Sequence, residues 1–398
     1  MRVLLSAFQC VPGRGSELGK AWHWARALAD AGHEVTVLTV TEHREAVQAA
    51  DEPRIAFHFV DRRDTRIGGH SAGWRVAKSY LRWQDDAERA AAGLAGQHDL
   101  IHHVTWGSLH LGSRLWRLGT PFVYGPIGGG QVAPPGYWRY FGRHWPMERA
   151  RTLATGSLLR WNGRSRETLK GAAMTLVTNS ATAAAARRLG AADVRYMLSE
   201  GLPADWLAGP RAQPSGVPVV LWVGRMLPRK APVLAVRAFA ELRRTMPAVL
   251  VMAGDGPMLG QVRDAVARYR IAGDVVLLGS VPWAEVTSLY DSASVLLFTS
   301  LRDSSGAQFL EALGRGLPAV ALDHHGIGDL DVGAAAVKVA VPGQPRALPG
   351  GLADALRTIL DGGQWERRSA AGIGWARQWT WPVKADAATR LYREVLGR

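Results

Sequence analysis

The sequence predicts an α/β protein with two successive domains, each built on a parallel sheet. Short apolar runs rich in Val, Ile and Leu alternate with longer stretches of helical spacing along nearly the whole chain. Glycine and proline interrupt this alternation over residues 201–218, which we interpret as a linker. The length of 398 residues also favours more than one domain. We therefore expect Rossmann-like domains over 1–200 and 219–378, facing each other across a cleft, and a helix over 379–398 that crosses back to the first domain.

The individual elements follow from the same patterns. Gly32 ends a helix over 21–31, at the position where a left-handed residue commonly closes helices. In the first domain, strands are predicted over 2–9, 33–40, 55–60, 99–104, 121–124 and 174–178. Further helices are predicted over 71–95, 108–118 and 181–189. The second series has strands over 219–223, 248–253, 275–278, 295–298 and 318–322, and helices over 231–244, 260–270, 306–314, 351–361 and 383–397.

Composition narrows the classes of function. The formal net charge of +14 favours acidic partners such as nucleotides or anionic lipid surfaces. No known nucleic-acid-binding module is visible, so we expect no nucleic-acid partner. The single cysteine, Cys10, excludes an internal disulfide and a cysteine-ligated zinc site. No secretory signal and no membrane-spanning apolar stretch are visible, which predicts a cytoplasmic protein.

The most informative stretch is 300–318, which follows an apolar strand. Asp303 and Glu311 lie eight residues apart, and Gly306 stands between them where a strand-to-helix turn is expected. Open α/β sheets bind ligands at the carboxyl ends of their strands, and a helix N-terminus there suits anions. A carboxylate can accept hydrogen bonds from neighbouring hydroxyl groups, which sugars and ribose present. The stretch therefore predicts a nucleotide-sugar site.

Three other loops follow strands of the second domain. Gly224, Arg225 and Lys230 bring a guanidinium fork and an ammonium point charge to a strand-to-helix junction, which favours phosphate. Gly254, in Ala-Gly-Asp-Gly-Pro, either forms a simple turn or passes close to a base or ribose. Val281, in Gly-Ser-Val-Pro, either lies in a connecting turn or frames the nucleobase through backbone groups.

Taken in order, these motifs resemble a known family. Gly-Arg…Lys, Ala-Gly-Asp-Gly-Pro, Gly-x-Val and an acid followed after seven residues by Glu-Ala-Leu-x-x-Gly-x-Pro-x-Val are similar to the donor half of retaining glycosyltransferase family 4. This family is also called glycosyl transferases group 1 and has the GT-B fold. The motif Gly-His-Glu-Val-Thr-Val from Gly32 and the segment Trp379-Thr-Trp381 resemble it too. The resemblance covers nearly the whole chain and is most specific over 219–325.

The resemblance implies roles for individual residues. Arg225 and Lys230 would bind the donor pyrophosphate and stabilise the leaving group, so that no metal or other cofactor is needed. Asp303 would bind hydroxyls of the donor sugar, and Glu311 would bind the ribose. The backbone at Gly306, Ala307, Gln308 and Phe309 would lie near the sugar or the phosphates. The implied reaction retains anomeric configuration, with a UDP-sugar such as UDP-GlcNAc or UDP-glucose favoured over GDP-mannose as donor.

Acceptor binding is assigned to the first domain, where the family varies most. Gly15 is expected near the donor, and the acceptor side is expected at Ser16, His102, His103, Trp106, Gly128 and Gly129. Either histidine could instead be a structural residue with satisfied hydrogen bonds. The acceptor implied is a small natural product or a lipid-linked glycan.

The sequence departs from the family pattern at three places. The first motif acid is usually Glu and here is Asp303, which is about one methylene shorter and bears on donor-sugar identity. Where the family often has a histidine after a strand, this chain has Gly125-Pro-Ile-Gly-Gly-Gly130. Gly326-Ile-Gly328 replaces the usual glycine pair followed by an acid.

Other interpretations explain parts of the sequence. The loop 13–19 with Glu42 partly matches the fingerprint of an NAD-dependent oxidoreductase, although its third glycine is displaced. Asp329-Leu-Asp331 matches the metal-binding Asp-x-Asp of other transferases but has no partner site. The arginine- and tryptophan-rich segment 137–170 fits either peripheral membrane contact, as in a non-catalytic basic membrane-binding module, or a solvated face over a tryptophan core.

Overall fold

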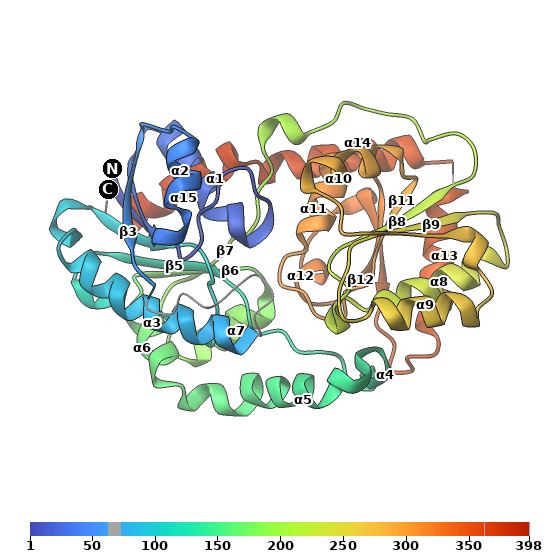
Figure 1. The fold of residues 1–398 in the computed structure, drawn as a ribbon, viewed down its shortest axis with the longest axis horizontal. Coiled ribbons are helices and arrows are strands. Elements are labelled where there is room, and N and C mark those ends of the chain that lie inside the picture. Colours follow the sequence, from blue (N-terminus) through green and yellow to red (C-terminus); the bar gives the residue numbers. More distant parts are fainter. Residues whose placement is uncertain (63–72, 362, 398) are drawn as a thin grey trace. The chain divides into compact units, whose positions relative to one another are not determined.

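The computed structural model describes residues 1–62, 73–361 and 363–397, without the side chains of Ser16, Gly73, Trp74, Ala95 and Ala284. By their contacts, the residues divide into two compact units (Figure 1). The first unit comprises Met1–Gly130, Thr155–Gly201 and Trp381–Arg398, and the second comprises Gln131–Ala154 and Leu202–Thr380.

The first unit contains a seven-stranded parallel sheet with the order β3-β2-β1-β4-β5-β6-β7. Its strands are β1 (Arg2–Ser6), β2 (Glu34–Val40), β3 (Ile55–Val60), β4 (Leu100–His103), β5 (Phe122–Ile127), β6 (Met174–Val177) and β7 (Val194–Tyr196). Its helices are α1 (Ser16–Asp30), α2 (Arg44–Ala49), α3 (Gly73–Ala92), α6 (Gly163–Gly171), α7 (Ser180–Arg188) and α15 (Trp381–Val395).

Helices cover both faces of this sheet, as the two-residue period of its strands requires. Val3 and Leu5 of β1 pack in one core cluster with Trp24 of α1 and Tyr392 of α15. Leu4, which points to the opposite face, packs in a second cluster with residues of α3, α6 and α7. Figure 1 shows α1 and α15 on one side of the sheet and α3, α6 and α7 on the other.

The second unit contains a six-stranded parallel sheet with the order β10-β9-β8-β11-β12-β13. Its strands are β8 (Val219–Val223), β9 (Val249–Ala253), β10 (Val275–Gly279), β11 (Val295–Phe298), β12 (Ala319–Asp323) and β13 (Ala336–Ala340). Its helices are α4 (Trp138–Phe141), α5 (Trp145–Leu153), α8 (Pro232–Arg243), α9 (Leu259–Arg268), α10 (Trp283–Ser292), α11 (Ala307–Gly314), α12 (His325–Gly328), α13 (Leu348–Leu360) and α14 (Trp365–Ala376).

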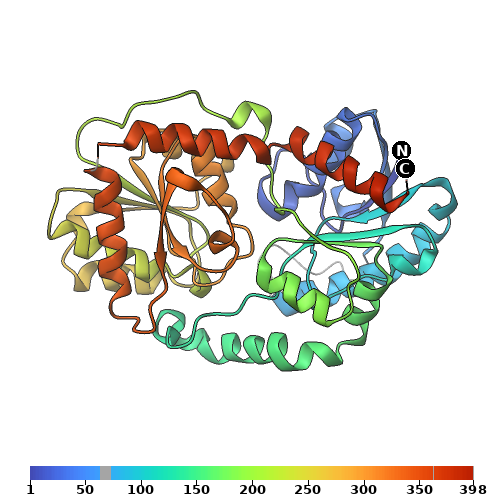
Figure 2. The same cartoon turned by 180° about the vertical axis from the view of Figure 1, so that it is seen from behind.

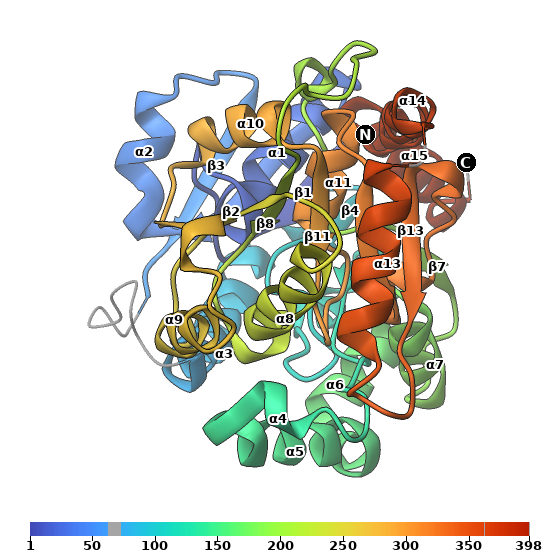
Figure 3. The same cartoon turned by 90° about the vertical axis from the view of Figure 1, so that its right-hand side faces the viewer.

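This sheet is also covered on both faces. The helices α8, α9 and α13 pack on one face, and α10, α11 and α14 lie on the other (Figure 3). Figure 2 gives the view from behind that of Figure 1. The interior strands β8 and β11 are almost wholly buried, which matches their uninterrupted runs of Val, Leu and Phe. The prediction of two parallel-sheet α/β domains is confirmed.

The assignment of residues 131–154 differs from the division expected from the sequence. The segment follows β5 of the first sheet along the chain, yet its contacts place it in the second unit. Within the expected linker 201–218 the chain forms a short 3-10 helix, Ala204–Trp206, and Leu202 makes an isolated parallel bridge to Thr380.

Two element predictions in the first unit were wrong. Residues 108–118 do not form a helix; a 3-10 turn, Leu115–Leu118, is the regular element there. Side chains from elsewhere fix this loop, since Tyr124 Oη donates to the Ser108 carbonyl at 2.8 Å and Thr168 Oγ1 accepts from Ser113 N at 2.9 Å. The helix predicted from residue 21 begins at Ser16, so half of the expected glycine loop is helical.

The helix predicted over 71–95 is observed over Gly73–Ala92, and residues 71 and 72 lie outside the described chain. None of the described helices combines the length and the apolar composition that crossing a bilayer requires.

Candidate donor site and its family

The strand order of the second sheet reverses direction at its centre, between β8 and β11. From β8 the chain builds outward through β9 and β10 on one side, and from β11 through β12 and β13 on the other. Ligands of open α/β sheets bind at such a reversal, outside the carboxyl ends of the two central strands. The loop after β8 carries Arg225 and Lys230, and the loop after β11 carries Asp303 and Gly306. The structure thus brings these four predicted residues to one edge.

The two loops are joined by hydrogen bonds. Thr299 Oγ1, just beyond β11, donates to the Lys230 carbonyl at 2.9 Å and accepts from Trp222 Nε1 at 3.1 Å, and all three residues are buried. Leu301 N donates to the Arg229 carbonyl at 2.9 Å. Buried hydrogen bonds of this kind fix the relative position of the loops because leaving them unmade is costly.

Lys230 and Asp303 form the central pair of the site. Lys230 Nζ lies 2.5 Å from Asp303 Oδ2 and 3.1 Å from Gln308 Oε1, and it sits 5.0 Å from the centre of the Phe298 ring. The lysine is only 7% exposed, so its charge is held in place by named partners rather than by water.

The charge of Asp303 is stabilised by its neighbours. Burial alone would raise the pKa of this carboxyl, but the ammonium of Lys230 and the guanidinium of Arg229 more than offset it. The net result is a pKa well below the usual range of aspartate. Ser304 N also donates to Asp303 Oδ1 at 2.9 Å. Asp303 is therefore an acceptor of hydrogen bonds at neutral pH and not a proton donor.

Gly306 makes the turn into α11. Its φ of +66° is the left-handed region, and a Cβ there would lie 2.7 Å from Ile327 Cδ1. The N-terminus of α11 consequently begins beside Asp303. Phe309 N already donates to the Gly306 carbonyl at 3.0 Å, so its amide is engaged within the turn.

Glu311 is oriented by a buried tyrosine. Tyr290 Oη donates to Glu311 Oε2 at 2.8 Å. Burial, together with the charge of Glu311, holds the pKa of Tyr290 well above its ordinary value, so the phenol remains a donor. Tyr290 could not be predicted as a site residue from the sequence, because a tyrosine at helical spacing in an amphipathic helix is indistinguishable from a core residue.

Backbone hydrogen bonds link the loops of the predicted glycine residues along the same edge of the sheet. Gly224 N donates to the Ala253 carbonyl at 2.9 Å, and Gly254 N donates to the Gly279 carbonyl at 2.6 Å. A Cβ on Gly254 would lie 1.9 Å from the Gly224 carbonyl oxygen, so no side chain fits between these loops. Val281 follows Gly279 in the connection to α10. Arg225, which follows Gly224, is exposed.

The first sheet has a corresponding reversal between β1 and β4. Gly15 caps α1, and the backbone of Ser16 opens that helix. Glu17 Oε1 accepts from the backbone N of Trp106 at 2.5 Å, which joins the loops after β1 and β4. Trp106 has a φ of +56°, unusual for a bulky residue, and its indole donates to Gln9 Oε1 at 3.0 Å. Strain of this kind is often stored at functional sites.

His102 and His103 lie in the core rather than at a surface. Both are fully buried. The ring nitrogens of His102 are 2.6 Å from Tyr392 Oη and 2.8 Å from the Gly125 carbonyl, and those of His103 are 2.8 Å from Tyr80 Oη and 3.0 Å from Ser6 Oγ. Burial lowers the pKa of His102 to about 4 and that of His103 to about 3. This geometry favours the structural interpretation of both histidines.

Gly128 and Gly129 lie next to a histidine that the sequence did not single out. Leu109 N donates to the Gly128 carbonyl at 3.0 Å, and His110 Nε2 lies 3.2 Å from the Gly129 carbonyl. His110 follows β4 in the loop wrongly predicted as a helix, so its position beside the glycine loop could not be anticipated.

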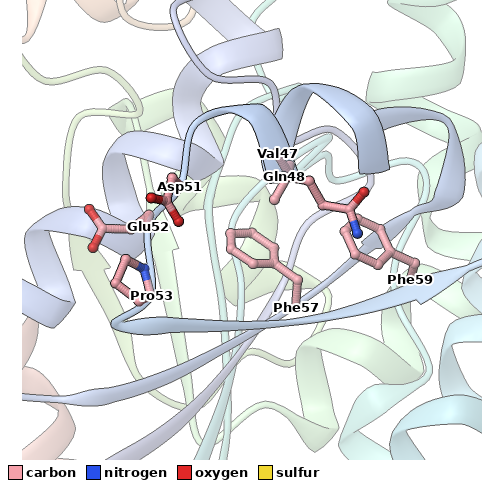
Figure 4. A pocket seen from close by; sticks show the side chains of 7 residues that line it. All are labelled: Val47, Gln48, Asp51, Glu52, Pro53, Phe57 and Phe59. Carbon is pink, nitrogen blue, oxygen red and sulfur yellow. The ribbon is translucent and has the colours of Figure 1, made fainter.

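A separate cavity of about 320 Å³ lies between α2 and β3 (Figure 4). Its lining residues are Val47, Gln48, Asp51, Glu52, Pro53, Phe57 and Phe59. It contains none of the predicted site residues. Two of its groups are engaged by arginines of the same unit: Arg44 lies 4.3 Å from the centre of the Phe59 ring, and Arg54 Nε donates to Glu52 Oε1 at 2.7 Å.

Over the described ranges, no cluster of three or more His, Cys, Asp or Glu side chains has the arrangement of a metal site.

Two units, each built on a parallel sheet covered by helices on both faces, have the architecture of the GT-B fold. Residues 209–368 match the family model described as glycosyl transferases group 1. Over these residues, which lie in the second unit, the chain is similar to this family of glycosyltransferases.

Comparison with individual proteins agrees. The chain is 23% identical to glycogen synthase of Mycobacterium tuberculosis over 98% of this chain and 94% of the relative. It is 35% identical to D-inositol 3-phosphate glycosyltransferase of Kineococcus radiotolerans, over 49% of each chain. Among solved structures, sucrose-phosphate synthase of Thermosynechococcus elongatus superposes with a TM-score of 0.69 at 18% identity, covering 100% of this chain and 99% of the other.

A second solved structure, Anabaena HepE in complex with UDP, has a TM-score of 0.65 at 15% identity and covers 98% of this chain and 100% of the other. At these identities the structural likeness establishes the fold.

Proposed function

We propose that this glycosyltransferase transfers a sugar from a nucleoside-diphosphate sugar to a hydroxyl group, with retention of anomeric configuration and without a metal. The observation that carries the proposal is the buried Lys230–Asp303 pair at the reversal of the second sheet, within the region that matches the family model. A fixed cation beside a fixed carboxylate supports the binding of phosphate next to sugar hydroxyls.

The roles of the residues follow from their chemistry. Arg225 is exposed at the end of β8 and offers five N–H donors to phosphate oxygens, while Lys230 supplies a point charge. Both stabilise negative charge as it develops on the departing diphosphate. Asp303 accepts hydrogen bonds from the donor sugar, and Glu311, oriented by Tyr290, accepts them from the ribose. The departing phosphate takes part in removing the acceptor proton.

For the donor we propose a UDP-sugar, with UDP-glucose or UDP-GlcNAc preferred to GDP-mannose. Support comes from the HepE structures, which were obtained with UDP and with UDP-glucose. The chain is also 30% identical to 2-deoxystreptamine glucosyltransferase of Streptomyces kanamyceticus over 37% of each chain.

For the acceptor we propose a small polyhydroxylated molecule or a lipid-linked glycan, bound by the first unit near Trp106, Gly128 and Gly129. Two relatives, an inositol phosphate glycosyltransferase and the deoxystreptamine enzyme, support a small cyclic acceptor.

Peripheral contact with an anionic membrane through residues 137–170 remains part of the proposal. Trp138, Met147, Leu153, Leu158 and Trp161 of this segment are exposed apolar side chains, at 49%, 75%, 54%, 60% and 73% respectively. Sedimentation with anionic and neutral vesicles tests it: binding to the anionic vesicles alone supports the contact, and binding to neither contradicts it.

A thermal-shift screen over nucleotide sugars tests the donor assignment. We expect at least one UDP-sugar to raise the melting temperature, and Lys230→Ala to abolish most of that rise. The matched control is Arg244→Ala, because Arg244 is 76% exposed and paired only at the surface with Glu241. If no nucleotide sugar stabilises the protein, the proposed function is wrong. Stabilisation that survives Lys230→Ala unchanged would contradict the phosphate role of Lys230.

A further inference from the structure

Residues 131–154 are anchored to the second unit at several separate points. Tyr137 Oη donates to the Pro342 carbonyl at 2.8 Å, and Arg237 Nη1 donates to Tyr140 Oη at 2.8 Å. His325 Nε2 lies 2.5 Å from the Val132 carbonyl. The anchors come from α8, α12 and the chain after β13, so the segment contacts elements on both sides of the central strands.

The last anchor is a buried ion pair beside the donor loop. Glu148 of α5 is 6% exposed, which is rare for a glutamate unless it is paired. Its partner is Arg302: Nε lies 2.7 Å from Glu148 Oε1, and Nη2 donates to Oε2 at 3.1 Å. Arg302 immediately precedes Asp303, the carboxylate proposed to bind the donor sugar.

Arg302 is held by main-chain contacts as well as by Glu148. Its N–H and its carbonyl contact Arg229, since Arg302 N donates to the Arg229 carbonyl at 3.3 Å and Arg229 Nη1 donates to the Arg302 carbonyl at 3.4 Å. Glu148 therefore fixes the side chain of a residue whose backbone is part of the junction between the two donor loops.

The charges of this region suit an anionic ligand. Burial lowers the pKa of Arg302 and the charge of Arg229 lowers it further, while Arg151 and Lys230 are the other cations of this region. Glu148 and Asp303 are the carboxylates that face them. Burial lowers the pKa of Arg151 to about 10, with the charge of Arg302 as a further cause. Glu148 offsets the repulsion among the positive charges next to Asp303, and without it this repulsion would be uncompensated.

We propose that residues 131–154 form part of the donor site and that Glu148 is a positioning residue for Asp303, acting through Arg302. This inference rests on the proposed function, since it presumes that Asp303 binds the donor sugar. It extends the donor site beyond the region that matches the family model, to a segment that the sequence places between β5 and β6 of the other sheet.

The proposal predicts a separation between sugar and nucleotide binding. With Glu148→Ala, Arg302 loses its partner and the 301–304 turn loses its fixed position, so the sugar contact of Asp303 is impaired. Arg225, Lys230 and Glu311 keep their places. We expect affinity for UDP-glucose to fall by roughly tenfold or more, whereas affinity for UDP changes by less than about threefold.

The experiment is titration calorimetry of the full chain with UDP-glucose and UDP, with GDP-mannose and GDP in parallel. The variants are Glu148→Ala, Glu148→Gln, Arg302→Ala and the Glu148→Ala/Arg302→Ala double variant, each checked for its melting temperature. Glu241→Ala is the matched control, because it removes a carboxylate of the same unit from an exposed pair. If Glu148 acts through Arg302, the double variant binds UDP-glucose no more weakly than Arg302→Ala alone.

The outcomes are distinct. Wild-type affinity for UDP-glucose in Glu148→Ala, or equal losses for UDP-glucose and UDP, would overturn the positioning role. Additive losses in the double variant would show that Glu148 does not act through Arg302 and would also overturn it. Should Glu148→Ala fail to fold, Glu148→Gln, which keeps the shape of the side chain, decides by the same criteria. Failure of the wild-type protein to bind any of these nucleotides and nucleotide sugars would instead refute the proposed function.

Discussion

At the scale of single residues, the donor site depends on one paired carboxylate. Asp303 is held by Lys230 and Arg229 and by the N–H of Ser304, and its pKa lies well below the usual range. It consequently stays ionised well below neutral pH, so we expect any acid limb near pH 4 to 6 in the pH profile of activity to come from another group.

Two substitutions of Asp303 test separately how the charge and the length of its side chain contribute to activity. Asp303→Asn should lower kcat/KM roughly 100-fold for all donors, because the sugar loses an ionised acceptor and Lys230 loses its buried partner. Asp303→Glu keeps the charge and adds one methylene, so we expect it to alter the ranking of donors instead. Steady-state kinetics with a panel of UDP-sugars measures both. Full activity of Asp303→Asn would show that the carboxylate does not contact the donor.

The buried histidines predict how stability depends on pH. His102 and His103 are neutral in the folded chain, with pKa values of about 4 and about 3 against 6.5 in the unfolded chain. As the pH falls from about 6.5 towards 4, the unfolded state binds protons that the folded state does not, so the free energy of unfolding decreases.

Melting temperatures of the wild type, His102→Asn and His103→Asn between pH 7 and pH 4.5 test this linkage. Each variant should be less stable at pH 7 and should lose stability less steeply on acidification, because one histidine whose pKa is lowered in the folded state has been removed. Parallel pH curves for the wild type and the variants would contradict the buried, neutral state of these residues.

At the scale of elements, the site is formed by loops whose backbones lie too close together for a side chain to fit between them. Gly254 has a φ of +142° and stands against the Gly224 carbonyl. Gly254→Ala should therefore destabilise the second unit by about 1–3 kcal/mol through backbone strain, with a further cost from the steric clash. Donor affinity should fall as well, because Gly224 is displaced.

Gly260→Ala is the control for this prediction. Gly260 lies in α9 with open space where a Cβ would be, so alanine should stabilise the helix by roughly 0.5–1 kcal/mol. Denaturant unfolding of both variants gives the comparison. Equal stability of Gly254→Ala and Gly260→Ala would show that the two loops are not in close contact.

The elements also show how far the sequence could predict the fold. The strands with dense apolar runs, such as β8 and β11, are present as expected, because burial on both faces leaves a strong signal. The edge strands β7 and β13 were not predicted, since β7 has only three residues, two of them exposed, and β13 is only partly buried. Residues 108–118 were predicted as a helix from composition, but tertiary hydrogen bonds to Tyr124 and Thr168 determine their conformation.

The site was predicted to a similar extent. Arg225, Lys230 and Asp303 were predicted as site residues because each follows a strand and carries charge, and the order of the strands places them at one edge; Glu311 was predicted from its spacing to Asp303, and the roles of all four stay predictions. Tyr290, Glu148 and Arg302 were not found. Their importance depends on which distant segments pack against them, and a single sequence does not carry that information.

At the scale of the whole molecule, the similarity to the family and the site support one proposal: a glycosyltransferase that binds a nucleotide sugar through its second unit. The net charge of +14 agrees with an anionic substrate, and the buried cations Lys230 and Arg302 show where part of that charge is placed. Residues 131–154 are flanked in sequence by segments of the first unit and supply Glu148, so substitutions there should change donor binding without altering the family motifs themselves.

The most direct test is nuclear magnetic resonance of a UDP-sugar incubated with the protein in EDTA, without acceptor. We expect slow release of UDP and free sugar, with the newly formed sugar first appearing in the anomeric configuration of the donor, and loss of this release in Lys230→Ala. Release of the inverted anomer would contradict the retaining mechanism, and release that requires an added metal would contradict the role given to Arg225 and Lys230. Absence of both binding and release with every nucleotide sugar would contradict the central claim.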